Sequence, residues 1–386
     1  MRVLIVHPKF YIYGGAELVI IKLANYLARK GIENAILTTS ILPEIEKDLL
    51  DTKIIIRKEP DIPFVSPGFK VILAIWRGIY DNLNNFDLIN IHNYPAELSF
   101  FPFRKKAVWL CNEPPGFVLR SKSELSLFLK LAKGVISKFD KFVVRHFIKN
   151  VIVADEFNAR RFEGLYGLRP EIINYGIDYN FFSQADPEKV KKEYCLNNNF
   201  VILQVGILTP LKNQIESIKT VEKLKYKISN VKLILAGLAD KEYKLKLEKY
   251  IQEKKLEEYV IFTGQLNGEK IRDLYHACDV LLHPIKTQGG WLSPFEALCA
   301  KKPIIVSSEM SASDIIKKEK IGVVTDDYEK IVMEIYKNKN EYLKMGERGR
   351  EFVKNNLSWE SFCQKNLNLF QKIFKPLIIG NENILR

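Results

Sequence analysis

The sequence predicts an α/β protein made of two doubly wound, parallel-sheet domains. Short, continuous apolar runs alternate with longer segments whose apolar residues recur at helical spacing. This pattern is typical of parallel strands that are buried on both faces between helices. The pattern occurs twice, on either side of a polar stretch near residues 183–196. A chain of 386 residues is also long enough for two domains of ordinary size.

The first series of elements starts at the N-terminus. A strand at residues 3–6 precedes an amphipathic helix at 16–30, which stops at Gly31, a common residue at helix ends. Four further apolar runs predict strands of the same sheet, at residues 35–38, 88–91, 107–110 and 151–154. We assign residues 1–185 to this first domain.

The second series occupies residues 196–358, which we assign to a second domain. Apolar runs predict its strands at residues 201–205, 231–236, 260–262, 280–282 and 304–306. Charged, amphipathic segments predict helices at 212–225 and 241–255. In sheets of this kind ligands bind beyond the carboxyl ends of the strands, so the cleft between two such domains is the expected site.

The composition excludes several classes of protein. The net charge of +13 suits nucleic acid, an anionic membrane or a phosphorylated substrate. No RNA-binding or helix-turn-helix pattern occurs, so nucleic acid is not expected. The five cysteines are scattered and form no Cys-x-x-Cys pair, which indicates neither a disulfide framework nor a zinc site and suits a reducing cytoplasm. No signal peptide is expected, and no apolar run approaches the roughly 20 residues that span a bilayer.

One segment concentrates the positive charge. Residues 104–149 hold 11 Lys and Arg against 3 Asp and Glu, and from Leu125 onward apolar residues alternate with basic ones. A basic amphipathic segment can lie on an anionic membrane, here on its cytoplasmic face. A solvated cationic face above a core-facing stripe explains the same pattern.

Residues 283–303 contain the most informative loop. Gly289 and Gly290 allow a backbone to approach a ligand closely, and Pro294 suits a helix start. The first turn of a helix offers free N–H groups to a phosphate, and Glu296, one turn inside, can accept hydrogen bonds from sugar or ribose hydroxyls. The alternative is an ordinary junction between a loop and a helix.

Further polar residues and glycines follow the ends of the predicted strands. Lys212 can neutralise a leaving diphosphate, and His92 can bind a sugar hydroxyl. Each of these residues also has a structural alternative. Gly14 and Gly15 can form a tight strand-to-helix turn, His92 can be a structural histidine with its hydrogen bonds satisfied, and Lys212 can be an exposed lysine. No Asp-x-Asp motif occurs, so a metal held by paired aspartates is not expected. The shared position at strand ends favours a single site formed by Gly14, Gly15, His92, Asn112, Gly206, Lys212, Gly264 and the 283–303 loop.

Taken together, these segments resemble the retaining GT-B glycosyltransferases of family 4 (glycosyl transferases group 1) over nearly the whole chain. The resemblance rests on MRVLIVHPKFYIYGGAELVI, FDLINIHNYPA, VIVADEFNARRF, VILQVGILTPLKN, VIFTGQLNGEKIRDLYHACDVLLHP, the 283–303 loop and LSWESFCQKNLNLFQKIF. The segment Cys111–Pro115 is similar to a mannosyltransferase subgroup.

The resemblance implies two Rossmann-like domains facing across a cleft, with a C-terminal helix (359–376) returning to the first domain. It implies transfer of a hexose, mannose or glucose, from a nucleotide sugar to a lipid-linked or glycan acceptor, with retention and with neither metal nor other cofactor. Catalytic roles fall to Lys212 (on the diphosphate), Gln288, His92 and Asn112. Donor-binding roles fall to Gly14, Gly15, Gly206, Phe262, Gly264, Gly289, Gly290, Trp291, Leu292 and Glu296, the last on the ribose.

Three positions depart from the pattern of the family. Gln288 stands where a glutamate is usual, Ile207 where an arginine is common, and Asn112 where a histidine is usual. These departures support an alternative, a catalytically weak or inactive relative that binds sugar nucleotides or glycans beside an active partner. A third reading, another GT-B enzyme such as a sugar-nucleotide epimerase, is opposed by the glycine loop and the final helix.

Overall fold

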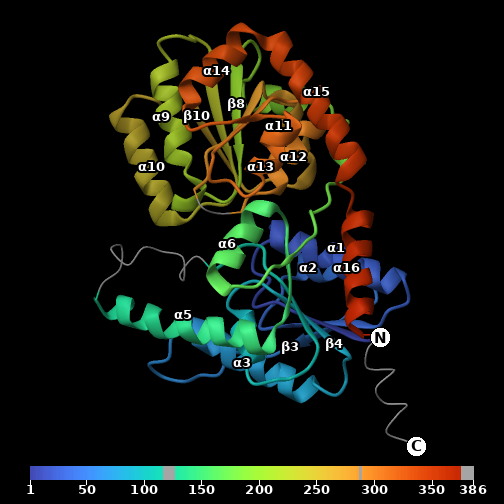
Figure 1. Ribbon diagram of the computed structural model, residues 1–386. Coiled ribbons are helices and arrows are strands. Elements are labelled where there is room, and N and C mark those ends of the chain that lie inside the picture. The colour runs from blue at the N-terminus through green and yellow to red at the C-terminus, as the bar shows by residue number, and fades with distance from the viewer. Residues whose placement is uncertain (116–126, 287–288, 375–386) are drawn as a thin grey trace, which may run out of the picture. The chain divides into compact units, whose positions relative to one another are not determined.

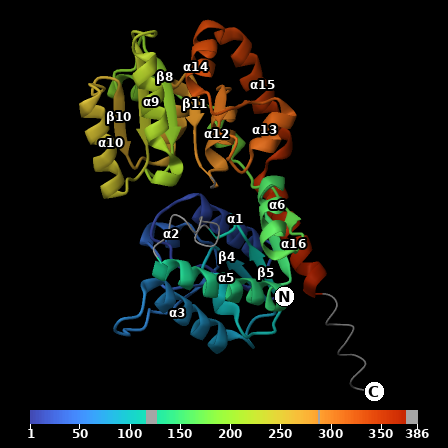
Figure 2. The same cartoon turned by 60° about the vertical axis from the view of Figure 1, so that its left-hand side comes forward.

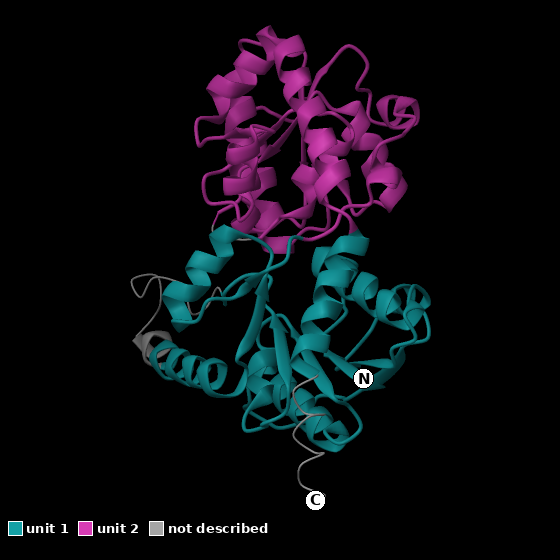
Figure 3. Cartoon of the chain, turned by 45° about the vertical axis from the view of Figure 1, so that its right-hand side comes forward, with its two compact units in different colours: residues 1–174, 359–386 teal, residues 175–358 magenta. Residues whose placement is uncertain are grey.

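The computed structural model describes residues 1–115, 127–286 and 289–374. The chain divides into two compact units, shown in different colours in Figure 3. Unit 1 comprises Met1–Asn174 and Trp359–Arg386, and unit 2 comprises Tyr175–Ser358. Residues 175–185, which the sequence analysis assigned to the first domain, therefore pack with unit 2.

Unit 1 is built on a seven-stranded parallel sheet. The strand order is β3-β2-β1-β4-β5-β6-β7, so the chain runs outward from β1 first to one edge and then to the other. In the centre, Val3–Val6 pairs with Asn34–Leu37 on one side and Leu88–Ile91 on the other. The strands are β1 (Val3–Val6), β2 (Asn34–Thr38), β3 (Lys53–Ile56), β4 (Leu88–His92), β5 (Ala107–Leu110), β6 (Asn150–Val153) and β7 (Glu171–Ile172).

Helices cover both faces of this sheet. Apolar side chains of α3, α5 and α6 and of the 3₁₀ segment η1 form one core with the strands, centred on the fully buried Trp109 and Phe162. On the other face α1 packs against the C-terminal helix. The helical segments of unit 1 are α1 (Gly15–Arg29), α2 (Pro43–Lys47), α3 (Pro67–Asn82), η1 (Ala96–Phe100), α5 (Leu127–Phe147), α6 (Glu156–Tyr166) and α16 (Trp359–Phe374).

The C-terminal helix α16 belongs to unit 1, although the residues before it belong to unit 2. The hydroxyl of Tyr26 on α1 donates to Gln364 Oε1 at 2.6 Å, and Lys106 Nζ donates to the carbonyl of Phe374 at 2.7 Å. The expected return of the last helix to the first domain is confirmed.

Unit 2 is built on a six-stranded parallel sheet. Its order, β10-β9-β8-β11-β12-β13, is that of the doubly wound nucleotide-binding fold, with the reversal of winding between β8 and β11. Figures 1 and 2 show this sheet between two layers of helices. The strands are β8 (Phe200–Val205), β9 (Val231–Ala236), β10 (Val260–Gly264), β11 (Val280–His283), β12 (Ile304–Val306) and β13 (Val323–Val324).

The helices of unit 2 divide between the two faces of the sheet. Those numbered α9, α10 and α14 share one apolar core with the strands, whereas α11 and α12 pack together elsewhere, α12 also against α15. Asp240 and Asn267 cap α10 and α11 by accepting from backbone N–H groups. The helical segments are α7 (Tyr179–Phe182), α8 (Glu188–Glu193), η3 (Pro210–Lys212), α9 (Gln214–Leu224), α10 (Lys241–Glu253), α11 (Gly268–Ala277), α12 (Leu292–Cys299), α13 (Ser313–Glu319), α14 (Tyr328–Lys337) and α15 (Lys339–Asn356).

The two parallel sheets confirm the predicted fold class, and every strand predicted from an apolar run is present within one or two residues. The short edge strands β3, β7 and β13 were not predicted. Both residues of β7 are exposed, β13 has only two half-buried residues, and β3 begins and ends with exposed residues. Among the described residues no helix is long and apolar enough to cross a membrane.

Candidate functional site

Lys212 lies at the carboxyl edge of the sheet of unit 2, but not in the helix that the sequence predicts there. It ends the 3₁₀ turn η3, and Asn213 then adopts a left-handed conformation (φ 56°) before α9 starts at Gln214. Gln204 fixes the turn, since its Nε2 donates to the Lys212 carbonyl at 2.7 Å. The half-buried side chain of Lys212 points across the sheet, where Nζ donates to the carbonyl of Gly289 at 2.7 Å.

The loop before α12 meets this lysine. Gly290 has a φ of 145°, and a Cβ atom there would lie 2.6 Å from His283 Nε2 and 3.2 Å from Lys212 Nζ. Only glycine fits this combination of backbone conformation and close approach. The carbonyl of Gly289 therefore contacts Lys212, and the carbonyl of Gly290 contacts His283 at the end of β11.

His283 is the buried partner of this loop. Its Nε2 lies 3.1 Å from the carbonyl of Gly290, so the proton of the neutral ring is on Nε2. Burial, and then the charge of Lys212, lower the pKa of His283 to about 3. The imidazole is therefore a neutral strut under the loop at physiological pH, while the positive charge of the site resides on Lys212.

Glycines continue the edge beyond β8, β9 and β10. Gly206 follows β8 directly, and a Cβ atom on Gly237 (φ 150°) would lie 2.2 Å from the Gly206 carbonyl. The N–H of Gly237 donates in turn to Gly264 at 3.0 Å. Phe262, half-buried on β10, has its ring 5.6 Å from Lys244 Nζ. The edge therefore presents glycine backbone with little side-chain cover, half-buried at Gly206 and Gly237 and exposed at Gly264, which suits a flat or charged ligand.

Glu296 stands one turn inside α12. The phenol of Tyr275 on α11 donates to its Oε2 at 2.7 Å. Burial raises the pKa of the Glu296 carboxyl to about 7, and the bond from Tyr275 opposes this rise. A carboxyl group with such a pKa is poised between a hydrogen-bond donor and a double acceptor at neutral pH.

Two residues at the start of α12, Leu292 and Trp291, differ in exposure. Leu292, the first residue of α12, is half-buried. Trp291 is 3% exposed and packs its ring against Phe295 at 4.4 Å and Tyr175 at 5.4 Å. The indole therefore anchors the start of α12, and a contact of Trp291 with a donor stays a prediction.

In unit 1, Gly14 and Gly15 form the start of α1. The N–H of Gly14 donates to Glu17 Oε2 at 3.2 Å, and Glu17 Oε1 lies 3.5 Å from Nε2 of His7. Both His7 and Glu17 are buried, at 3% and 6% exposure. A glutamate inside the first turn thus ties the glycine loop to a histidine at the end of β1.

His92 and Asn112 end the neighbouring strands. His92 is fully buried, its Nε2 lies 2.7 Å from Asn90 Oδ1, and burial, with a smaller contribution from His7, lowers its pKa to about 3. The side-chain amide of Asn112 donates to Asn93 Oδ1, and the backbone carbonyl of Asn112 accepts from the side-chain amide of Asn158. Catalytic roles for His92 and Asn112 stay predictions.

Each unit therefore gathers its own part of the predicted set. Unit 2 brings Lys212, Gly206, Gly289 and Gly290 together and places Glu296 on the adjoining helix. Unit 1 brings Gly14 and His92 to one sheet edge through His7. Gln288 lies outside the described residues. No role was predicted from the sequence for His283, Tyr275, His7 or Glu17, although all four lie in segments that carried the family resemblance.

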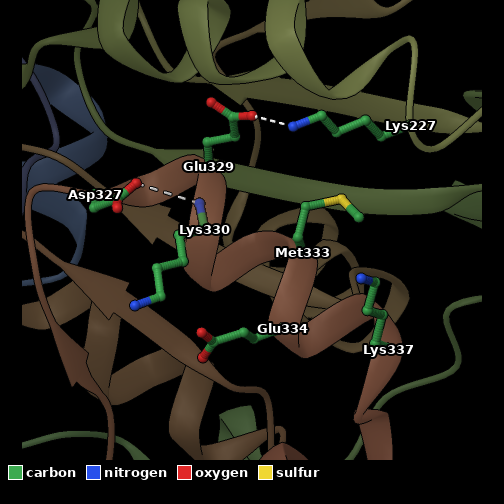
Figure 4. Close-up of a pocket in the computed structure, with 7 residues that line it drawn as sticks. All are labelled: Lys227, Asp327, Glu329, Lys330, Met333, Glu334 and Lys337. Atoms are coloured by element: carbon green, nitrogen blue, oxygen red, sulfur yellow. Dashed lines mark hydrogen bonds and ion pairs between the residues drawn. The ribbon is translucent and has the colours of Figure 1, made fainter.

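A separate surface pocket of unit 2 contains none of the predicted site residues. Figure 4 shows it over α14, lined by side chains of both charges, with the Lys227–Glu329 ion pair at 2.6 Å. Within the described residues no group of three or more His, Cys, Asp or Glu side chains could hold a metal ion.

Comparison with known families identifies the class of protein. The family described as "Glycosyl transferases group 1" matches residues 186–352, and "Glycosyltransferase Family 4" matches residues 13–181. The two matches follow the two units closely. The chain belongs to the family 4 glycosyltransferases and has the GT-B fold, and it is therefore an enzyme of the glycosyl-transfer class.

Individual relatives agree with this assignment. The human alpha-1,3/1,6-mannosyltransferase ALG2 is 21% identical over 294 residues, which cover 71% of this chain and 69% of ALG2. Trehalose synthase of Thermococcus litoralis is 24% identical over 302 residues, covering 75% and 70%. The crystal structure of Anabaena Alr3699/HepE in complex with UDP-glucose has a TM-score of 0.79 at 17% identity, covering 96% of this chain and 100% of HepE.

Proposed function

We propose that the protein transfers a hexosyl group, mannose or glucose, from a nucleotide sugar to a lipid-linked or glycan acceptor, with retention of configuration and without a metal ion. The observation that carries this proposal is the position of Lys212. Its ammonium group lies at the glycine-lined carboxyl edge of the unit 2 sheet, in contact with the Gly289 carbonyl. A half-buried cation among glycine backbone groups suits a diphosphate.

The chemistry follows from the charge that develops during transfer. The bond between the anomeric carbon and the phosphate oxygen breaks, and the leaving nucleoside diphosphate takes the electron pair. Lys212 neutralises this charge, which is the usual means of stabilising such a transition state. The acceptor oxygen bonds to the anomeric carbon on the same face, and its proton passes to the leaving phosphate oxygen.

The surrounding residues bind and orient the donor. Glu296 in its ionised form accepts hydrogen bonds from the ribose hydroxyls, and Phe262 and Gly264 line the base. His283 stays neutral and keeps the Gly289–Gly290 loop in place, so it does not compete with Lys212 for the phosphates. In unit 1 we assign Gly14, Gly15, His92 and Asn112 to the acceptor and the reacting end of the donor.

The relatives support the choice of substrates. ALG2 is named as a mannosyltransferase, and the HepE crystal holds UDP-glucose, so a nucleotide-sugar donor and a glycan or lipid-linked acceptor fit this chain. A non-catalytic binding role is not favoured, because the relatives with named functions include a mannosyltransferase and a synthase.

A donor screen followed by one substitution tests the proposal. Wild-type protein is assayed with nucleotide sugars and glycan or lipid-linked acceptors, and the product's anomeric configuration is read by NMR. Lys212→Ala should lower kcat about 100- to 1000-fold, the usual cost of removing a transition-state charge partner. Lys249→Ala, which removes a lysine 78% exposed on α10, is the matched control. Full transfer by Lys212→Ala would reject the role of Lys212, and loss of transfer in EDTA would reject the metal-independent reaction.

Helix α5 supports a further part of the proposal, peripheral binding to the cytoplasmic face of an anionic membrane. Val135, Phe139 and Phe142 form a helical stripe exposed by 70%, 39% and 44%. Lys138 and Arg145 are exposed beside it, and α5 lies on the outside of unit 1 in Figure 1. Exposed rings flanked by cations are typical of interfacial helices. Residues 116–126 of the basic segment lie outside the described residues.

Flotation with anionic and with neutral vesicles tests this part. Binding should require anionic lipid and weaken with salt, and a Phe139→Ser, Phe142→Ser variant should bind less. Binding that ignores lipid charge and salt would reject it. The five free cysteines suit a cytoplasmic location.

A further inference from the structure

Tyr275 donates a hydrogen bond to Glu296 from a neighbouring helix. Its phenol donates to Glu296 Oε2 at 2.7 Å, and the nearby Ser293 hydroxyl opposes the rise in the pKa of the phenol that burial causes. Ser293 and Glu296 both lie on α12, whereas Tyr275 reaches them from α11. The bond therefore ties the helix that carries the carboxylate to a second helix.

Tyr275 itself is rigidly held. It is fully buried, its ring packs edge-on against Phe182 at 5.9 Å, and its carbonyl accepts from the thiol of Cys278 at 3.3 Å. A buried phenol needs a hydrogen-bond partner, and here that partner is the glutamate of the donor site. The core of unit 2 therefore positions the Tyr275 hydroxyl independently of α12, the helix that carries Glu296.

The bond acts on one oxygen of the carboxylate. Within the described part of the chain, the hydrogen bond that the structure shows for Glu296 is the one to Oε2. A hydrogen bond from a hydroxyl to a carboxylate favours the ionised form and fixes the plane of the group. Oε1 then remains to accept from a ligand in a defined direction.

We propose that Tyr275 is a positioning residue, which holds the Glu296 carboxylate ionised and oriented so that it binds the vicinal diol of a nucleoside diphosphate. The inference rests on the proposed function, because it takes Glu296 as the ribose ligand. The inference adds that Tyr275 determines the pH range in which Glu296 is ionised and can accept two hydrogen bonds. Without the phenol, the half-buried carboxyl group would be protonated over a wider pH range and would turn one oxygen into a donor.

The pKa values of the cysteines and histidines near Glu296 are shifted away from neutral pH. Burial raises the pKa of Cys278 to about 12 and that of Cys299 still further, while it lowers the pKa of His276 and lowers that of His283 to about 3. Arg350 on α15 also faces Cys299. A change in binding near pH 7 therefore reports on Glu296 or on the ligand's own phosphate.

Calorimetric titration from pH 6 to 9 tests the proposal, with UDP and GDP as probes and the 2′,3′-dideoxy analogue of whichever binds. The analogue carries the same diphosphate and so corrects for phosphate titration. For wild type, the preference for the ribose form over the dideoxy form should grow as pH rises through about 7. For Tyr275→Phe the preference should be about 10-fold smaller at pH 7, as loss of one hydrogen bond to a charged group predicts, and should recover by pH 9.

Controls separate positioning from folding. Tyr250→Phe removes a comparable phenol-to-carboxylate bond, to Glu222 at 2.5 Å, on the surface of the same unit and should leave the profile unchanged. Ser293→Ala should shift the profile in the same direction by less, and it serves as the second variant if Tyr275→Phe does not fold. A wild-type protein that binds neither nucleotide overturns the proposed function. A wild type that binds, beside a Tyr275→Phe profile identical to it or equally weakened at every pH, overturns only the role of Tyr275.

Discussion

Two buried carboxyl groups make the stability of unit 1 depend on pH. Asp140 on α5 and Glu97 on η1 are both fully buried, and Asp140 Oδ2 accepts from the phenol of Tyr166 at 2.7 Å. Burial raises the pKa of Asp140 to about 6, against the bond from Tyr166 that lowers it. Burial, and then the charge of Asp140, raise the pKa of Glu97.

The sign of the effect follows from proton binding. The folded state holds its protons to a higher pH than the unfolded state, where the pKa of aspartate is about 3.9. The contribution of these two groups to the free energy of unfolding should therefore be largest below pH 4 and fall as pH rises through about 6. Since one pKa unit corresponds to about 1.4 kcal/mol, Asp140 contributes on the order of 3 kcal/mol to this fall, and Glu97 acts in the same direction.

The perturbation is Asp140→Asn, which keeps an oxygen for Tyr166 to donate to but cannot ionise. Its amide adds a cost that does not depend on pH, so the useful quantity is the change in unfolding free energy between pH 4.5 and 8. Because part of the effect has already occurred by pH 4.5, this change should be more negative for wild type than for Asp140→Asn by roughly 2 kcal/mol. Glu97→Gln should reduce it as well.

Urea unfolding followed by tryptophan fluorescence measures this change, because three of the four tryptophans (76, 109 and 359) lie in unit 1. Asp61→Asn, at a fully exposed side chain, is the control and should leave the pH dependence unaltered. Parallel curves for wild type and Asp140→Asn from pH 4.5 to 8 would refute the reasoning.

Other predictions follow from close contacts and from ligand binding. Gly346→Ala should destabilise unit 2 by about 1–3 kcal/mol in thermal unfolding, because its Cβ would lie 2.2 Å from the Lys301 carbonyl. Gly164→Ala, which meets nothing within 4 Å, should instead be neutral or stabilising by up to about 1 kcal/mol. Gly290→Ala should abolish transfer, measured with the best donor, and should also lower the melting temperature, because the added Cβ meets the buried His283 at a backbone conformation that favours glycine. A nucleoside diphosphate at about 100 times its Kd should raise the unfolding free energy by about 2.7 kcal/mol, and removing it by dialysis should reverse the shift.

Local sequence patterns were sufficient for most of the fold. A central strand is buried on both faces, so its residues must be apolar in an unbroken run, and such runs predicted the core strands of both sheets within one or two residues. Edge strands escaped prediction because solvent covers part of them: Lys53–Ile56 begins and ends with exposed residues. The helix start at Lys212 was wrong because Asn213 takes a left-handed conformation, which Asn tolerates but sequence periodicity does not reveal.

The candidate site divides in the same way. The glycines and Glu296 could be singled out from sequence, because a strand end followed by glycine and a helix start has a local signature. Which residues contact one another had no such signature. Lys212 meets the Gly289 carbonyl 77 residues away, and Tyr275 meets Glu296 across 21 residues and two helices.

The sequence by itself determined that this protein has two parallel α/β sheets and the glycine-rich strand ends of a family 4 glycosyltransferase, because burial and backbone conformation constrain residues one at a time. Three-dimensional packing was needed to show that His283 is a neutral strut beneath the Gly289–Gly290 loop, that Tyr275 donates to Glu296, and that Glu97 and Asp140 share a buried interior. Protonation and orientation depend on what surrounds a group in space, and packing brings those neighbours from distant parts of the chain.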